Sequence, residues 1–147
     1  MIVPEPLIEL GFGVRSLSYE DFETACEITG FPVVLVDEKL IEEGLTFPRT
    51  RGGRRFRVIV LRRTLFKQQL TEAAWHEFAH AYYEHYGVRC FVRGSEDRFE
   101  TQADDLALCC MIPTLWVRTK SFEELLGEGF SPECLRRRKE IYDSCGI

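Results

Sequence analysis

All three histidines of the chain lie within ten residues of one another, in the segment AAWHEFAHAYYEHYG from Ala73 to Gly87. The segment has the pattern of a helix, in which successive residues are turned by about 100° around the axis. His76 and His80 then share one face, whereas His85 points to the opposite side. Two imidazoles one helical turn apart can bind one divalent metal ion, which is the chemistry that this spacing predicts first.

The residues between the first two histidines complete the pattern H-E-x-x-H, with Glu77 as its acid. Glu77 lies beside the histidines without being needed as a ligand. A carboxylate in this place can accept a proton from a water that a metal ion has acidified, so we predict Glu77 as the catalytic base. Because so short a pattern also arises by chance, on partly exposed histidines of a surface helix, a metal site needs a third ligand.

The segment FETQADDLALCCMIP offers that third ligand. Glu100 and Asp104 are four residues apart on one face of a helix that we predict over residues 96–112. The 19 residues between His80 and Glu100 allow the chain to return to the first helix. Glu100 would complete a two-histidine, one-glutamate site for one Zn²⁺ per chain. Asp104 would accept the free N–H of a ligand histidine and fix its tautomer.

Other assignments of these residues remain open. Glu84 shares the histidine face and is a rival ligand, although its Cα is predicted to lie about 12 Å from that of His76. Glu100 and Asp104 could instead belong to a solvated acidic face. Tyr83 lies beside the histidine face and is the candidate donor for stabilising a tetrahedral intermediate of peptide hydrolysis.

The flanking sequence predicts the elements that position these residues. Ser18 caps a helix that ends at Gly30, and the apolar run FPVVLVD after it is predicted as a buried strand. Gly52-Gly53 supplies the turn of a hairpin, and Pro48 confines the first arm of that hairpin to a sheet edge. A helix over residues 67–86 follows, with Trp75, Ala79, Tyr82 and Tyr86 as its buried stripe.

The helix over residues 96–112 is followed by two shorter ones, capped by Ser121 and Ser131. The fold class that this order predicts is α+β. We expect a small zincin-like domain with an N-terminal helix, a three-stranded twisted sheet, the histidine helix, the glutamate helix and short C-terminal helices.

The composition is that of one globular domain of 147 residues, 45% hydrophobic and with a net charge of −5. We expect a catalytic core over residues 1–120 and a C-terminal helical element over 121–147 packed on it. The N-terminus lacks the pattern of a signal peptide, and no apolar run is long enough to span a membrane. The six cysteines include no C-x-x-C pair, which favours reduced thiols and a cytoplasmic location.

Two basic segments need separate interpretations. The hairpin carries seven arginines between Arg49 and Arg63 and no acid. It could dock an extended, acidic partner on its edge strand, or its charges could only protect that edge. The sequence RRRK at residues 136–139 could belong to a DNA-binding helix-turn-helix. Because the pI is about 5.3, we expect a packing element there and no direct nucleic-acid binding.

The two motifs together resemble the ImmA/IrrE family of zinc metallopeptidases. HEFAH matches its H-E-x-x-H helix, and the second motif, E-x-x-A-(N/D)-x-(F/L)-A followed by proline, is matched at Glu100, Ala103, Asp104, Leu106, Ala107 and Pro113. Weaker similarity extends over most of the chain. The chain departs from the common pattern at Ala79 (often glycine), Asp104 (often asparagine) and Leu106 (often phenylalanine), but no ligand or base is lost.

The resemblance implies an intracellular zinc endopeptidase that cleaves a helix-turn-helix transcriptional repressor, of the short anti-repressor type without a C-terminal sensor region. His76, His80 and Glu100 would bind zinc, and Glu77 would be catalytic. Two other functions remain as alternatives. One is a regulatory protein that keeps the zinc fold and sequesters its repressor without cleavage. The other is a DNA-binding regulator that uses the C-terminal helices and the arginine hairpin.

Overall fold

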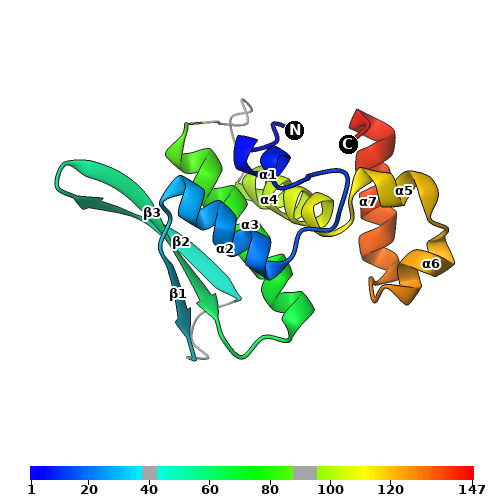
Figure 1. Ribbon diagram of the computed structural model, residues 1–147, viewed down its shortest axis with the longest axis horizontal. Coiled ribbons are helices and arrows are strands. Elements are labelled where there is room, and N and C mark those ends of the chain that lie inside the picture. Colours follow the sequence, from blue (N-terminus) through cyan, green and yellow to red (C-terminus); the bar gives the residue numbers. More distant parts are fainter. Residues whose placement is uncertain (38–42, 88–95) are drawn as a thin grey trace.

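The computed structural model describes residues 1–37, 43–87 and 96–147, and these residues form an α+β fold of seven helices and a three-stranded sheet (Figure 1). The strands are β1 (Val33–Val36), β2 (Gly44–Arg51) and β3 (Arg54–Arg62). The helices are α1 (Glu5–Glu9), α2 (Tyr19–Thr29), α3 (Lys67–His85), α4 (Glu96–Met111), α5 (Thr114–Thr119), α6 (Phe122–Gly127) and α7 (Pro132–Cys145). The predicted fold class is confirmed, but α1 and α5 had no signal in the sequence strong enough to predict them.

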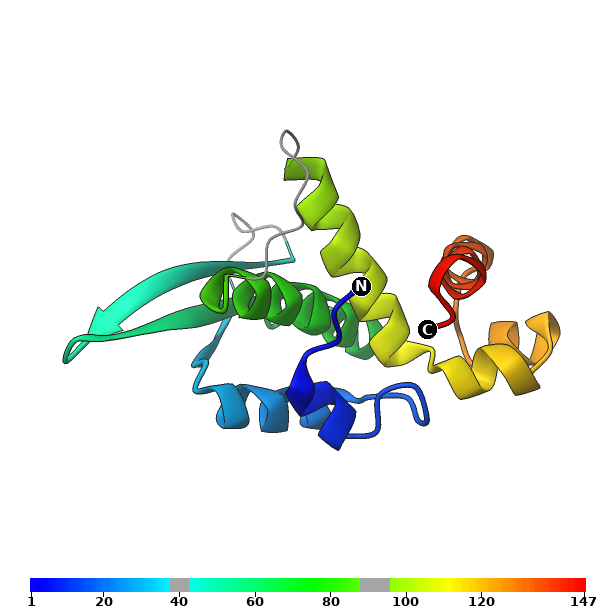
Figure 2. The same cartoon turned by 90° about the horizontal axis from the view of Figure 1, so that it is seen from above.

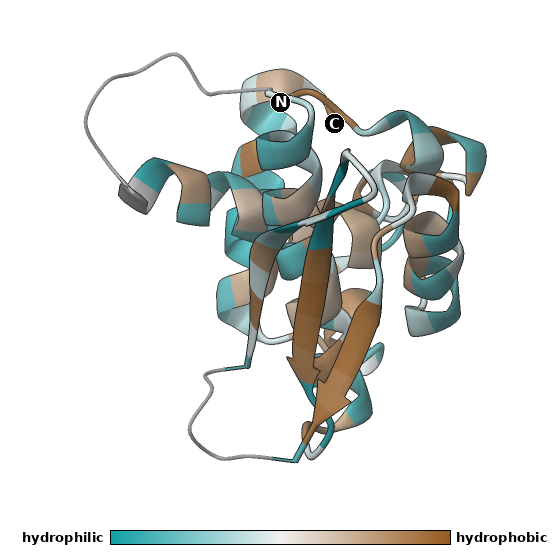
Figure 3. Cartoon of the chain, turned by 90° about the vertical axis from the view of Figure 1, so that its left-hand side faces the viewer, coloured by the Kyte–Doolittle hydropathy of each residue, from teal (hydrophilic) through white to brown (hydrophobic). Residues whose placement is uncertain are grey.

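The sheet has the order β1-β3-β2, with β1 parallel and β2 antiparallel to β3. Gly52 and Gly53 form the hairpin turn with φ values of 58° and 76°, as predicted. Pro48 lies on β2, which is an edge strand. The predicted strand is present as β1, but the prediction that it is buried was wrong: Val34 is 46% exposed, and Val33 and Leu35 are only partly buried. β1 forms the other edge of the sheet, and among the described elements helices pack on only one face of it (Figure 3).

Helix α3 lies between the sheet and the helices α2 and α4, so it is covered on two sides (Figures 1 and 2). Trp75 anchors it: the indole Nε1–H donates to the Leu17 carbonyl over 3.2 Å, and the ring meets Phe22 and Phe78 edge-on. The predicted stripe is correct at Trp75 but wrong at Tyr86, which is 53% exposed. A helix packed from two sides buries more than one stripe, and α3 ends close to Tyr86.

The C-terminal helices lie at the opposite end of the molecule from the sheet (Figure 1). α7 packs on α4 and α5, and two consecutive arginines hold it there. Arg137 forms a paired contact with Asp105 at 2.8 and 2.7 Å. Arg138, 1% exposed, donates to the carbonyl oxygens of Ile112 and Ile147 at 2.7 and 2.5 Å. Both guanidinium groups are therefore part of a packing element.

Replacing Arg138 by Ala is expected to lower the free energy of unfolding by about 2–4 kcal/mol, because it leaves the buried Ile112 carbonyl and the partly buried Ile147 oxygen without their donor. Arg136→Ala is the matched control, since Arg136 is the exposed neighbour on the same helix. Urea unfolding followed by circular dichroism measures both. Equal stability of the two variants would contradict a structural role for Arg138.

None of the helices in the described ranges combines the length and apolar composition needed to cross a bilayer. The described cysteines, which exclude Cys90, form no disulfide. Burial raises the pKa of the Cys109 thiol to about 11, and the pKa of Cys110 is also raised by burial. These two thiols are therefore held protonated in the core at neutral pH.

Candidate metal centre

The packing of α4 against α3 brings Glu100 onto the two histidines. Within the described ranges, His76, His80 and Glu100 form the one group of side chains that could hold a metal ion, with their ligand atoms all within 4.8 Å of one another. The two Nε2 atoms are 3.1 Å apart. The carboxylate oxygens of Glu100 lie 3.2 Å from Nε2 of His76 and 3.0 Å from Nε2 of His80. The structure thus places the three predicted ligands together.

These separations suit a metal ion of the size of Zn²⁺. Ligand atoms about 2.0–2.2 Å from zinc in a tetrahedral arrangement are about 3.3 Å from each other. The three observed separations, 3.0–3.2 Å, fall close to that value. Two imidazole nitrogens and one carboxylate are also a donor set that catalytic zinc sites use, in which the fourth position is left for water or substrate.

Asp104 fixes the orientation and tautomer of the first histidine, as the sequence predicts. Its carboxylate lies 2.7 Å from Nδ1 of His76. A carboxylate can only accept, so Nδ1 carries the proton and the lone pair of Nε2 faces Glu100 and His80. Burial alone would lower the pKa of His76, but the hydrogen bond to Asp104 and the charges of Glu77, Asp104 and Glu100 outweigh it and raise the pKa. The pKa of His80 is lowered by burial and by the neighbouring His76.

The raised pKa of His76 predicts how the metal-free protein responds to pH. The folded state binds this proton more tightly than the unfolded chain, whose histidine has the ordinary pKa of 6.5. The resulting contribution to stability is complete below pH about 6.5 and is lost as the pH rises through the raised pKa. We expect the decline to become smaller in Asp104→Asn, because the charges of Glu77 and Glu100 still raise the pKa of His76. Denaturant unfolding of the metal-free protein between pH 5 and 9 tests this, and identical profiles for both proteins would contradict it.

Glu77 borders a pocket of about 210 Å³ that is also lined by two of the candidate metal ligands, His76 and Glu100. The Glu77 residue is 7% exposed and is therefore largely buried at the edge of this pocket. Five acidic side chains line this pocket, and burial together with the charges of Glu43 and Asp104 raises the pKa of one of them, Glu72. The other four are Glu43, Glu77, Glu100 and Asp104.

Gly44, at the start of β2, lies directly against the proposed base. A Cβ added there would lie 2.8 Å from Cγ of Glu77 and 3.0 Å from the Val60 carbonyl oxygen. The contact explains why glycine occupies this position. Sequence reasoning missed Gly44 and Glu43, because only the return of β2 along α3 brings them to the histidines. It also missed Glu72, although this residue lies on α3 one turn before the first histidine and helical spacing alone places it on the histidine face.

Gly44→Ala is expected to lower the rate of hydrolysis by about 10- to 100-fold by displacing Glu77, because small misplacements of a catalytic group are costly. Bound metal should remain as in the wild type, since no ligand is moved directly. Gly127→Ala is the control, because a Cβ there meets nothing within 4 Å. Kinetic and metal assays on both variants test this, and a wild-type rate in Gly44→Ala would show that the contact does not constrain Glu77.

Tyr83 does not have the role that the sequence suggested. It is 4% exposed, does not line the ligand pocket, and its hydroxyl donates to the Ile2 carbonyl over 2.6 Å. The hydroxyl proton of Tyr83 is therefore used in this hydrogen bond with the N-terminal segment. The N-terminal segment that receives it could not be placed beside α3 from helical spacing alone.

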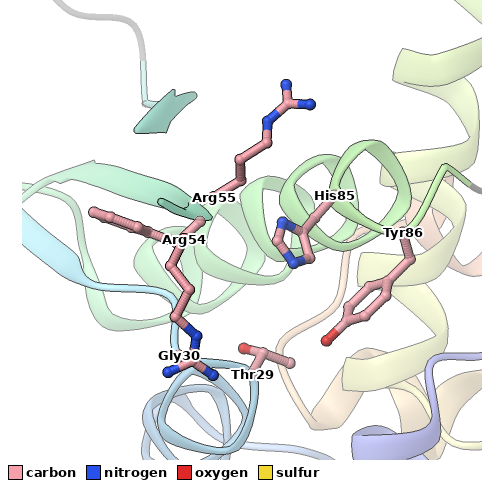
Figure 4. Close-up of a pocket in the computed structure, with 7 residues that line it drawn as sticks. Thr29, Gly30, Arg54, Arg55, His85 and Tyr86 are labelled. Carbon is pink, nitrogen blue, oxygen red and sulfur yellow. The ribbon is translucent and has the colours of Figure 1, made fainter. Parts of the chain in front are cut away.

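Glu84 and His85 make their contacts away from the candidate metal-binding group. Glu84 forms an ion pair with Arg57 of β3 at 2.6 Å and is not part of the metal-binding group. His85 points away from the site, as predicted, and packs edge-on against Phe31. It lines a separate pocket of about 310 Å³ between the ends of α2 and α3 and the start of β3, together with Arg54 and Tyr86 (Figure 4).

Comparison with known proteins adds no relative: no family model, no curated protein and no solved structure matches this chain.

Proposed function

We propose that the protein is a zinc-dependent endopeptidase. The observation that carries the proposal is the convergence of His76, His80 and Glu100 at 3.0–3.2 Å, with Glu77 on the border of the same pocket. A two-histidine, one-glutamate set suits catalytic zinc, and a purely structural site would more often use four protein ligands. Hydrolysis also needs a general base, and Glu77 is a carboxylate that lies next to the ligands without being one of them.

Each residue then has a defined task. When bound, zinc supplies Lewis acidity, which lowers the pKa of a water and polarises the scissile carbonyl. Glu77 accepts the proton of the attacking water and passes it to the amine that leaves. Asp104 holds the His76 ring through its Nδ1–H. The carboxylates around the pocket favour the protonated, positively charged amine as it departs.

The strand β2 offers a place for the substrate chain. Among the described strands it pairs with β3 alone, so its second edge has main-chain donors and acceptors for an extended peptide, except that Pro48 has no N–H to donate. Its first residue, Gly44, lies against Glu77. A peptide added along β2 would therefore run directly into the pocket of the metal ligands.

The resemblance of the two motifs to the ImmA/IrrE family supports a helix-turn-helix repressor as the substrate, and an intracellular anti-repressor role. A DNA-binding role for the C-terminal helices is less well supported. Arg137 is engaged by Asp105, Arg138 is buried, and Lys139 pairs with Asp143, so one arginine of RRRK, Arg136, stays exposed without an acid within ion-pair distance in the described residues.

Incubation of the zinc-loaded protein with an unfolded protein and with a helix-turn-helix repressor tests the proposal. We expect both proteins to be cleaved, with the cleavage sites identified by mass spectrometry. Cleavage should stop when a chelator removes the metal. Repressor that binds to zinc-loaded protein but stays intact would favour sequestration over hydrolysis. A protein that binds no zinc at micromolar concentration would contradict the proposal itself.

A further inference from the structure

The hairpin of β2 and β3 carries positive charge that the fold does not neutralise. Of the seven arginines between Arg49 and Arg63, Arg57 pairs with Glu84 at 2.6 Å, and Arg63, which directly follows β3, lies 3.8 Å from Asp37. In the described parts of the chain no acid lies within ion-pair distance of the other five. These five are Arg49, Arg51, Arg54, Arg55 and Arg62. The hairpin projects away from the helices, so its tip is open to a partner (Figure 2).

The register places like charges opposite each other. Arg51 pairs with Arg54, next to the turn, and Thr50 pairs with Arg55. Directly opposed side chains point to the same face, and like charges there destabilise a sheet. One or two charges are enough to protect an edge strand, so edge protection does not explain two arginines that face each other. The cluster therefore indicates an anionic partner that is absent when the chain is alone.

Of these five arginines, Arg62 lies at the other end of the hairpin, where its main-chain N–H donates to the Glu43 carbonyl. The remaining four arginines, Arg49, Arg51, Arg54 and Arg55, lie towards the turn and are joined to the metal site by the open edge of β2. At about 3.3 Å per residue, Arg49 lies about 17 Å and Arg51 about 23 Å from Gly44 along the strand. Gly44 lies against Glu77. A peptide paired with β2 would thus place its residues about five to seven positions from the scissile bond beside the arginines.

We propose that the substrate is an extended segment with acidic side chains about five to seven residues from the scissile bond, on one side of it only. This inference rests on the proposed peptidase function and defines its substrate class. The restriction to one side follows from the charges. Acids on the β2 side meet arginines, whereas acids close to the scissile bond meet the carboxylates of Glu43, Glu72 and Asp104 at the pocket.

An acidic peptide fits this surface better than a nucleic acid does. All 24 acidic residues of the chain lie outside the segment from Arg49 to Arg63, so a long polyanion would be repelled by the rest of the molecule. The free edge of β2 also offers main-chain hydrogen bonds, which a peptide backbone can use and a duplex cannot.

Fluorescence anisotropy of labelled peptides tests the docking. A twelve-residue Thr/Val/Ser peptide with two Glu near one end is compared with its Gln counterpart, using zinc-loaded protein with Glu77→Gln so that no peptide is consumed. We expect the Glu peptide to bind about tenfold more tightly, with the difference shrinking at high salt. The double variant R51E/R54E should abolish the difference. The double variant R118E/R136E changes the net charge equally at exposed positions and should retain it.

The outcomes separate this inference from the proposed function. Equal affinities for the Glu and Gln peptides, or equal loss in both double variants, would overturn acidic docking. Tighter binding of duplex DNA, sensitive to R51E/R54E, would also overturn it in favour of a nucleic-acid surface. In the zinc-loaded wild type we expect cleaved bonds about five to seven residues from the acids. Acid-dependent binding without cleavage would support acidic docking and contradict the peptidase function. Cleavage that does not depend on the acids would support the peptidase function and contradict acidic docking.

Discussion

Glu77→Gln is expected to lower kcat by about 10²- to 10⁴-fold while leaving bound zinc at the wild-type level. Glutamine has nearly the same shape as glutamate, so the contact with Gly44 can be kept. Its amide cannot accept the proton of the attacking water. The effect should therefore fall on kcat, with little change in KM, because the residue acts in the transition state.

Two measurements make this result specific. Zinc content by elemental analysis separates a lost base from a lost metal, and thermal unfolding shows whether the variant is folded. Repressor binding should persist in Glu77→Gln, so a complex with intact repressor is expected to accumulate. Unchanged turnover in the variant would remove Glu77 from the mechanism and leave the pocket without an identified base.

The grouping of the candidate metal ligands could be predicted from the sequence because it depends on local periodicity. His76 and His80 are one turn apart on α3, and Glu100 and Asp104 are one turn apart on α4, so each pair was placed on one face before any packing was known. The structure then needed only one long-range event, the packing of α4 on α3, to bring the pairs together. The capping serines were predictable for the same reason, since each bonds three residues along the chain, as Ser18 does with Asp21.

The remainder of the site depends on packing between segments that are distant in sequence. Gly44 reaches Glu77 through the register of β2 on β3 and the position of α3 over both. Tyr83 is within one turn of the histidines, yet its hydroxyl is held by the chain start at Ile2. Helical spacing gives the face of a residue but not what covers that face, and for this reason Tyr83 was assigned to the wrong neighbour.

Glu100→Gln is expected to weaken zinc binding by more than about 100-fold, since loss of a residue that only supports a ligand costs about 10- to 100-fold. Asp104→Asn should fall in that lower range, because it replaces the charged acceptor of the His76 proton by a weaker, neutral one and removes no ligand. Glu84→Gln should have no effect, because Glu84 pairs with Arg57. Competition with a chromogenic chelator at pH 7.5 measures all three dissociation constants.

The order of the three constants matters more than any one of them. Glu84, Glu100 and Asp104 are all acids near the histidines, so a general loss of negative charge would weaken zinc binding about equally in each variant. In contrast, zinc affinity should fall most when a direct ligand is replaced, less when a supporting acceptor is replaced, and not at all when the residue has neither role. Equal losses in Glu100→Gln and Glu84→Gln would mean that the contacts at 3.0 and 3.2 Å belong to an acidic surface and that α4 supplies no ligand.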